Sequence, residues 1–309
     1  MRKKGEIYLV GMKLLLVVML FVLSQLSIAR EQRSFNDQVL EVGAETAEIK
    51  AYGKYKPSHF SADKKVVLVS WNSDEGKARF FRSRYNNDFF QLANNYQPQA
   101  NPLYCGIASS VIVLNTIRAS SGKIPVQLEA SIKKPKVLGG QVVPYNLYSQ
   151  ASLLNDTTDK VKPRQIIQLK NISPDEQDGT DSFDPGLKLE ELKGVLESYQ
   201  LSVEKFSAES DIKSGADKFR KTLKTVLAEK ERFILINYKS DMVGQLGSGH
   251  ISPVGAYDEQ SDSVLVLDVA GYQNPWLWIP VSDLYASMHI KDGKEYRGYL
   301  VVSEGNASN

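Results

Sequence analysis

The stretch Gln99-Ala100-Asn101-Pro102-Leu103-Tyr104-Cys105-Gly106-Ile107-Ala108-Ser109-Ser110 contains the only cysteine of the 309-residue sequence. Asn101-Pro102 is typical of a loop, whereas Ile107 and Val111 follow at helical spacing. Cys105 is therefore predicted to lie in the first turn of a helix, where unpaired N–H groups and the helix dipole favour an anion. A thiolate in that position is a good nucleophile. The alternative interpretation is a small buried hydrophobic side chain, and the stretch alone leaves both open.

The composition is that of a globular protein and excludes several classes of function. Apolar residues make up 42% of the chain and charged residues 24%, which is enough for a sizeable core. The net charge of +2 predicts no nucleic-acid partner, because such a partner requires a clustered basic excess. A single cysteine allows neither an internal disulfide nor a thiolate-rich metal site, so no metal-binding residues are predicted.

The N-terminus resembles an export signal. Basic residues precede the apolar run Leu14 to Leu23, and Ser27-Ile28-Ala29 supplies small residues of the kind found at cleavage sites. This run is shorter than the roughly 20 residues that cross a bilayer. Residues 1–29 are therefore predicted to be a signal peptide that directs export to the periplasm or cell exterior. An uncleaved membrane anchor is the second interpretation. Residues 30–60 are polar and predicted to be an extension or linker, and residues 61–309 a catalytic domain.

Patterning in the remaining chain indicates an α+β fold. Apolar residues at helical spacing predict helices over residues 80–92, 105–120, 187–199 and 219–227. Short β-rich segments, bounded by turn residues, follow at 233–238, 250–257, 263–269 and 297–303. Because helices precede strands without regular alternation, we expect a helical lobe, which carries Cys105, packed against an antiparallel β-sheet lobe.

One of the three histidines combines with a buried aspartate. His59 and His289 have ordinary structural explanations, whereas His250 follows Gly247-Ser248-Gly249 and begins a predicted strand. Asp268 ends a neighbouring apolar strand, where a carboxylate is costly to bury without a partner. If the two strands pair, Asp268 can accept a hydrogen bond from His250 and orient it, as the third member of a catalytic triad does.

Gln99 completes the predicted site. Attack on an amide builds negative charge on the carbonyl oxygen, which needs hydrogen-bond donors. The N–H of Cys105 is one candidate, and the side-chain amide of Gln99, six residues upstream, is a second. Glutamine, cysteine, histidine and aspartate in this order and spacing are typical of papain-like cysteine peptidases, although the tryptophan that usually follows the papain cysteine is absent.

Several motifs follow one another from about Val67 to Val302. They include Gln-x-x-x-x-x-Cys-Gly-x-Ala-Ser at 99–109, Gly-His-x-Ser-Pro-Val-Gly-x-Tyr at 249–257, Leu-x-Leu-Asp-Val-Ala at 265–270, Pro275-Trp276, Asn237-Tyr238 and Arg297-Gly298-Tyr299. In these motifs and in their order, the sequence resembles the phytochelatin synthase family.

The resemblance implies a papain-like fold and glutathione γ-glutamylcysteinyltransferase chemistry. Cys105 would attack the Cys–Gly amide of glutathione and release glycine, with His250 as base and acid. The γ-Glu-Cys acyl-enzyme would then react with water or with a second glutathione. Asn237 and Arg297 are implied as residues that hold the polar ends of the substrate.

The resemblance also bears on metals. Plant and yeast members carry an additional cysteine-rich C-terminal region, whereas this sequence resembles the short prokaryotic members, in which hydrolysis can dominate. No cofactor is required, and cadmium or zinc would enter as a glutathione-thiolate substrate or as an activator in metal detoxification. The competing hypothesis is an exported thiol- or metal-binding protein that uses the same scaffold without turnover. A membrane partner is expected only if the N-terminal segment stays attached, and no oligomeric state is predicted.

Overall fold

The computed structural model describes residues 66–118, 127–133, 137, 139–145, 147–167 and 186–305. The predicted signal peptide, the predicted extension and His59 all lie outside these residues. The described residues belong to one compact unit that begins at Lys65. None of the helices within the described ranges is long and apolar enough to cross a membrane.

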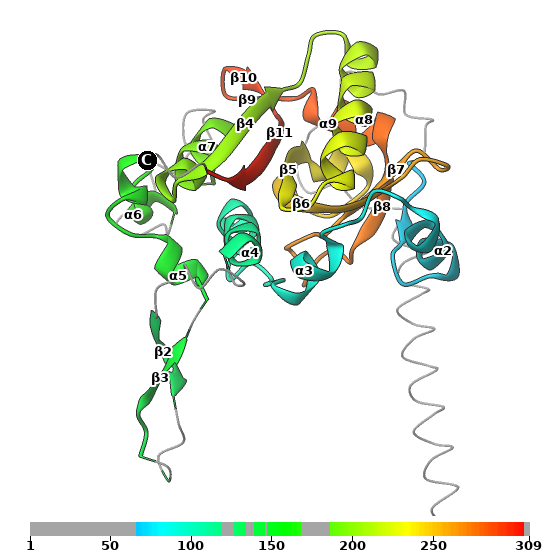
Figure 1. Cartoon of the computed structure of the whole chain (residues 1–309). Coiled ribbons are helices and arrows are strands. Elements are labelled where there is room, and N and C mark those ends of the chain that lie inside the picture. The colour runs from blue at the N-terminus through cyan, green and yellow to red at the C-terminus, as the bar shows by residue number, and fades with distance from the viewer. Residues whose placement is uncertain are drawn as a thin grey trace, which may run out of the picture. The chain divides into compact units, whose positions relative to one another are not determined.

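A seven-stranded sheet forms the centre of this unit (Figure 1). Its strand order is β1-β8-β7-β6-β5-β11-β4, and every neighbouring pair is antiparallel. The strands are β1 (Val69–Ser70), β4 (Leu201–Ser207), β5 (Arg232–Lys239), β6 (Gly249–Asp258), β7 (Ser263–Val266), β8 (Leu277–Pro280) and β11 (Gly298–Glu304). Two separate two-stranded sheets pair β2 (Gln127–Lys133) with β3 (Val142–Tyr145), and β9 (Lys291–Asp292) with β10 (Glu295–Tyr296).

The helices surround this sheet. They are α2 (Asp74–Arg82), α3 (Phe89–Asn94), α4 (Cys105–Arg118), α5 (Gln150–Leu153), α6 (Arg164–Ile167), α7 (Leu189–Ser198), α8 (Ile212–Ala228) and α9 (Val281–Met288), with 3-10 turns η2 (Thr158–Lys160) and η4 (Ser240–Val243). The α+β prediction is confirmed. However, the helices do not form one lobe against one face of the sheet, because apolar side chains cover both of its faces.

Alternation along β5 explains the two helical layers. Phe233 and Leu235 belong to the core cluster that includes α4 and α7, whereas Ile234, Ile236 and Tyr238 belong to the cluster with α8 and α9. Successive side chains of a strand point to opposite faces, so a strand covered on both faces is apolar along most of its length. Burying each of these side chains contributes about 1.5–3 kcal/mol. Helix α4 is likewise buried at every residue except Thr116, so it lies inside the molecule and fixes the position of its N-terminus.

The predicted single helix over residues 80–92 is wrong. Helix α2 ends at Arg82 and α3 begins at Phe89. Between them the Ser83 hydroxyl donates to the Tyr257 carbonyl at 2.6 Å, and the backbone of Tyr85 bridges to Tyr257. These bonds to β6 replace the bonds that a continuous helix would make, so two short helices are separated by a segment that contains Tyr85.

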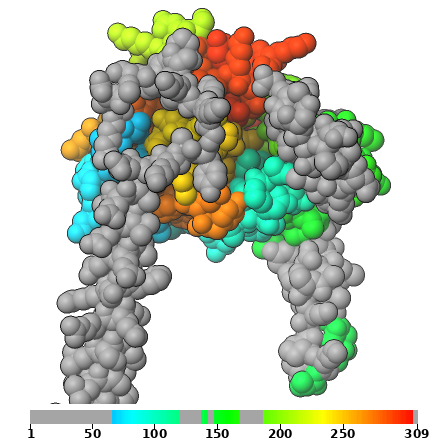
Figure 2. All heavy atoms as spheres, turned by 180° about the vertical axis from the view of Figure 1, so that it is seen from behind, coloured from blue at the N-terminus to red at the C-terminus, as the bar shows by residue number. Residues whose placement is uncertain are grey.

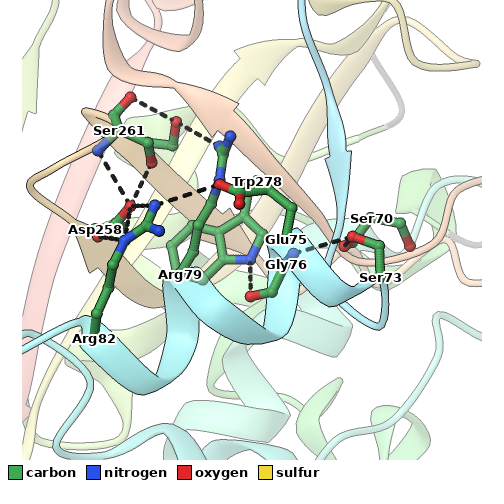
Figure 3. A network of polar contacts seen from close by, with 10 residues as sticks. Ser70, Ser73, Glu75, Gly76, Arg79, Arg82, Asp258, Ser261 and Trp278 are labelled. Atoms are coloured by element: carbon green, nitrogen blue, oxygen red, sulfur yellow. Dashed lines mark hydrogen bonds and ion pairs between the residues drawn. The ribbon is translucent and has the colours of Figure 1, made fainter.

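Helix α2 is fixed to the sheet through polar contacts (Figure 3). The Ser73 hydroxyl caps its start by accepting from Gly76 N at 3.0 Å. Near its end, the guanidinium of Arg82 binds the carboxylate of Asp258, at the end of β6, with Nη2 to Oδ2 at 2.6 Å. The Trp278 indole N–H donates to the Gly76 carbonyl at 3.1 Å, so both ends of α2 are attached to the sheet.

Candidate active site

Cys105 is the first residue of α4, as the sequence predicts, and its thiol is free and buried. The turn before it is held by Asn101, whose side-chain oxygen accepts from Leu103 N at 2.9 Å and whose carbonyl accepts from Tyr104 N at 3.1 Å. Gln150 holds the upstream part of the loop by donating to Pro98 O and accepting from Ala100 N. The sulfur therefore occupies a fixed position at the positive end of a buried helix.

His250 lies on β6 and reaches Asp268. Its Nε2 is 2.8 Å from Asp268 Oδ1, and both side chains are buried. Strands β6 and β7 are neighbours, as the prediction required, and Asp268 follows the end of β7. The hydroxyl of Ser109 donates to the Ile251 carbonyl at 3.1 Å, which ties α4 to the strand that carries His250. In Figure 2 the yellow, orange and teal parts of the chain meet on one face of the molecule.

The Asp268 carboxylate is fully buried and surrounded by donors. Besides His250, Oδ1 accepts from Ala270 N at 2.8 Å, and Oδ2 accepts from the Gln245 side chain at 2.9 Å. Gln245 Oε1 in turn accepts the Tyr238 hydroxyl proton at 2.7 Å. Such a set of donors compensates for the burial of a negative charge. It leaves the second ring nitrogen of His250, Nδ1, to interact with Cys105.

The electrostatics favour a protonated His250. Burial opposes its protonation most strongly, but hydrogen bonds to Asp268 and Cys105, together with their negative charges, outweigh burial and raise the pKa of His250 from 6.5 to about 10. The imidazole is therefore an imidazolium at neutral pH, placed between a carboxylate and a sulfur. A histidine beside a cysteine is the arrangement that activates a nucleophilic thiol.

Gln99 is also buried, in the loop that leads to Cys105. Its backbone N–H donates to Val269 O at 2.8 Å, and the Tyr96 hydroxyl donates to Asp268 O at 2.7 Å, so this loop is bound to the segment that carries Asp268. The Gln99 side-chain Nε2 lies 2.7 Å from the Tyr272 hydroxyl. Its Oε1 is buried without a hydrogen-bond partner among the described residues. If the amide is turned by 180°, Oε1 accepts from Tyr272 and the NH₂ group becomes available as a donor.

Asn237 and Arg297 come together in a second cluster. Arg297 Nη1 donates to Asn237 Oδ1 at 2.6 Å and lies 2.9 Å from Asp292 Oδ2. A Cβ atom at Gly249 would lie 2.8 Å from the guanidinium, so a larger residue next to His250 would displace the Arg297 side chain. The Nε of Arg297 is buried and has no partner within the part of the chain that the structure describes. Asp292 also lines a cleft between the start of α7 and the β9–β10 hairpin.

Gln245 and Asp292 are members of these clusters that were not predicted from the sequence as site residues. Gln245 follows Gly244, whose φ of 82° marks a tight turn, but a turn does not predict which polar group its neighbour contacts. Asp292 lies in a short hairpin of charged residues, where a solvated aspartate is the ordinary expectation. Over the described ranges, no three His, Cys, Asp or Glu side chains gather closely enough to hold a metal ion.

The sequence is similar to one family of known proteins. The sequence matches the family described as phytochelatin synthase over residues 64–299. It is 28% identical over 242 residues to glutathione gamma-glutamylcysteinyltransferase 1 of Lotus japonicus, covering 76% of this chain and 40% of the relative. It is 27% identical over 242 residues to the Arabidopsis thaliana protein of the same name, with 76% and 41% covered. For the Schizosaccharomyces pombe glutathione gamma-glutamylcysteinyltransferase the identity is 23% over 258 residues, with 82% and 53% covered. The matched segment thus spans about half the length of these relatives.

Proposed function

This chain belongs to the phytochelatin synthase family, and from that premise we propose that it uses Cys105 to cleave the Cys–Gly amide bond of glutathione and to transfer the γ-Glu-Cys unit. The single observation that carries this proposal is the hydrogen bond of 2.8 Å between His250 and Asp268, with His250 held protonated beside the cysteine at the start of α4. The names of the relatives supply the substrate class. We further propose that this arrangement, a cysteine on a helix facing a histidine on an antiparallel sheet, is papain-like.

In the first step the Cys105 thiolate attacks the cysteinyl carbonyl carbon of glutathione. A carbon–sulfur bond forms, and the carbonyl π electrons move onto the oxygen. Donors for this oxyanion are the N–H of Cys105 and the Gln99 amide in its turned orientation, which removes the unsatisfied buried oxygen of Gln99. Removing one donor of this type typically costs about 10²–10³ in kcat.

Collapse of the intermediate re-forms the carbonyl and breaks the carbon–nitrogen bond. The imidazolium of His250 gives its proton to the glycine nitrogen, which leaves as the free amino acid. The product on the enzyme is a γ-Glu-Cys thioester. Neutral His250 then takes a proton from the incoming nucleophile, which is water or the α-amine of a second glutathione, and the departing Cys105 sulfur restores the ion pair. Water gives γ-Glu-Cys, whereas glutathione gives the first phytochelatin.

The Asn237–Asp292–Arg297 cluster is a suitable site for the charged end of the substrate. The free Nε edge of Arg297 complements a carboxylate, and Asp292 complements an ammonium group, both of which glutathione carries at its γ-glutamyl end. Position supports this role, because the guanidinium packs on Gly249, the residue before His250. The fully buried Asn237 fixes the orientation of Arg297 by accepting a hydrogen bond from its guanidinium.

Incubating the full chain with glutathione tests the proposal directly. We expect glycine release and a γ-Glu-Cys or longer γ-glutamyl product by mass spectrometry, and we expect Cys105→Ala to abolish both. Ser110→Ala is the matched control, because Ser110 lies on the same buried helix and its side chain, among the described residues, bonds only to the Gly106 carbonyl. It should retain activity within about twofold. Glycine release by Cys105→Ala would contradict the mechanism, and stoichiometric binding of glutathione without turnover would favour the thiol-binding alternative.

The same products measured with and without cadmium or zinc test the role of metal. We propose that these ions enter as glutathione thiolates, as part of the substrate. A larger share of oligomeric product in the presence of the metal is then expected, because a metal thiolate brings a second glutathione to the acyl-enzyme. An identical product ratio with and without metal would refute this part of the proposal. Export through residues 1–29 remains a prediction, tested by N-terminal sequencing of the mature chain.

A further inference from the structure

Gln245 is a buried residue whose side-chain amide contacts Asp268, a member of the candidate triad. It follows η4, and its backbone N–H donates to Ser240 O at 3.1 Å. The next residue, Leu246, is clamped by Asn274, which accepts from Leu246 N and donates to Leu246 O, each at 3.0 Å. The side chain of Gln245 is therefore presented from a loop that is fixed on both sides, and only 3% of the residue is exposed.

The chemistry of its two partners determines the orientation of the Gln245 amide. Asp268 Oδ2 lies 2.9 Å from the Gln245 nitrogen, and a carboxylate can only accept, so the NH₂ group must face Asp268. The Gln245 oxygen then faces Tyr238, whose hydroxyl donates at 2.7 Å. Burial and the negative charges of Asp268 and Cys105 raise the pKa of Tyr238, so this hydroxyl keeps its proton and remains a donor. Tyr238 therefore donates to Gln245, and Gln245 donates to Asp268.

We propose that Gln245 is a positioning residue that holds Asp268 in the rotamer which binds His250, and so maintains the His250–Cys105 ion pair. Asp268 uses one oxygen, Oδ1, for His250 and for Ala270 N, and the other, Oδ2, for Gln245. Without Gln245, Oδ2 loses its donor, and the carboxylate can rotate to share its oxygens differently between the remaining partners. The proposal rests on the catalytic roles proposed above, but it concerns the ion pair and can be tested without glutathione.

The single cysteine makes a direct test possible, because iodoacetamide alkylates only Cys105 in this chain. The rate of alkylation of the full chain, followed by mass spectrometry from pH 4 to 10, measures how much thiolate is present at each pH. We expect Gln245→Leu to move the midpoint of this profile upward by about one pH unit, and to lower glycine release at pH 7 by about tenfold, because a misaligned Asp268 stabilises the imidazolium less well.

Gln245→Glu provides a conservative rescue. A protonated carboxyl can donate to Asp268 Oδ2 as the amide does, and two carboxyl groups this close share one proton. This variant should follow the wild-type alkylation profile at pH 5–6 and diverge at higher pH, where the shared proton is lost. Asn274→Ala is the control for the loop, because Asn274 anchors Leu246 without touching Asp268. It should lower the melting temperature without moving the midpoint.

The outcomes separate the two proposals. If Gln245→Leu remains folded by thermal unfolding and keeps the wild-type alkylation profile, Gln245 is only structural and the inference is overturned. If Asn274→Ala moves the midpoint as far as Gln245→Leu does, the effect belongs to the loop, which also overturns it. If wild type releases no glycine from glutathione but Gln245→Leu still moves the alkylation midpoint, the positioning role stands and the proposed reaction fails.

Discussion

Two buried carboxylates on neighbouring parts of the same hairpin have partners of different kinds. Asp258 ends β6 and binds the guanidinium of Arg82 through both of its oxygens, with Ser261 as a further donor (Figure 3). Asp268 follows β7 and binds His250, Gln245 and Ala270 N. Both aspartates are at most 1% exposed, so burial alone does not distinguish a structural carboxylate from one that we propose to be part of a catalytic site.

The partner makes the difference. Arginine is always charged, so the Arg82–Asp258 pair holds α2 on the sheet and has no proton to exchange at neutral pH. Burial raises the pKa of Asp258, but the bonds from Arg82 and Ser261 outweigh burial and keep that pKa below its usual value. Histidine gains and loses a proton, and its second nitrogen is available to a thiol. A buried aspartate thus contributes to chemistry when its partner titrates and has a further group to act on.

The largest expected difference between the two aspartates is in activity, and Asp268→Ala tests it. Removing the group that orients His250 should lower kcat/KM for glycine release by about 100-fold, equivalent to about 2.7 kcal/mol of transition-state stabilisation. Asp258→Ala should leave kcat/KM within about twofold, since the Asp258 side chain, within the described part of the chain, bonds only to Arg82 of α2 and to Ser261 of its own turn. Steady-state kinetics on folded protein measures both. Equal losses of activity in the two variants would mean that both carboxylates act through stability alone.

Asp258→Asn tests the other half of the comparison. It removes the charge that Arg82 pairs with, and the expected loss in free energy of unfolding is about 1–3 kcal/mol, at the lower end because the Arg82 side chain is 29% exposed. Chemical denaturation measures this loss. The control is Lys193→Ala, which removes an exposed ion pair with Glu197 on α7 and should cost less than about 0.5 kcal/mol. If Asp258→Asn loses as little free energy of unfolding as Lys193→Ala does, the Arg82–Asp258 pair does not stabilise the fold.

The smallest of the expected effects is on the pH dependence of stability. The His250–Asp268 pair and the Arg82–Asp258 pair should contribute to the free energy of unfolding over different pH ranges. The pKa of His250 is raised, so its contribution is complete below pH 6.5 and is lost as the pH rises towards 10. The pKa of Asp258 is lowered, so its contribution is present above pH 3.8 and is lost as the pH falls further. Melting temperatures of wild type, Asp268→Asn and Asp258→Asn across this range provide the measurement. We expect the first variant to flatten the alkaline side and the second the acid side, and the reverse pattern would contradict the assignment.

Much of the site was predictable because its chemistry depends on residue types and on local structure. The start of α4 at Cys105 follows from a loop with Asn101-Pro102 and from apolar residues at helical spacing, which are local properties of the chain. The pairing of His250 with Asp268 followed from two adjacent apolar strands and from the cost of burying a carboxylate without a partner. The break between α2 and α3 was not predictable, because the bonds of Ser83 and Tyr85 to Tyr257 join residues far apart in the sequence.

The sequence by itself therefore determined the α+β class, the cysteine at the start of a helix, and the pairing of a histidine with an aspartate. Only the tertiary structure decided which polar groups complete the site. Gln245 reaches Asp268 from a turn, Tyr238 reaches Gln245 from a strand, and Asp292 reaches Arg297 from a hairpin. Their side chains carry no local pattern, because a hydrogen bond to a buried carboxylate depends on where the chain returns in space. That return is set by the packing of α4 and α8 on opposite faces of the sheet.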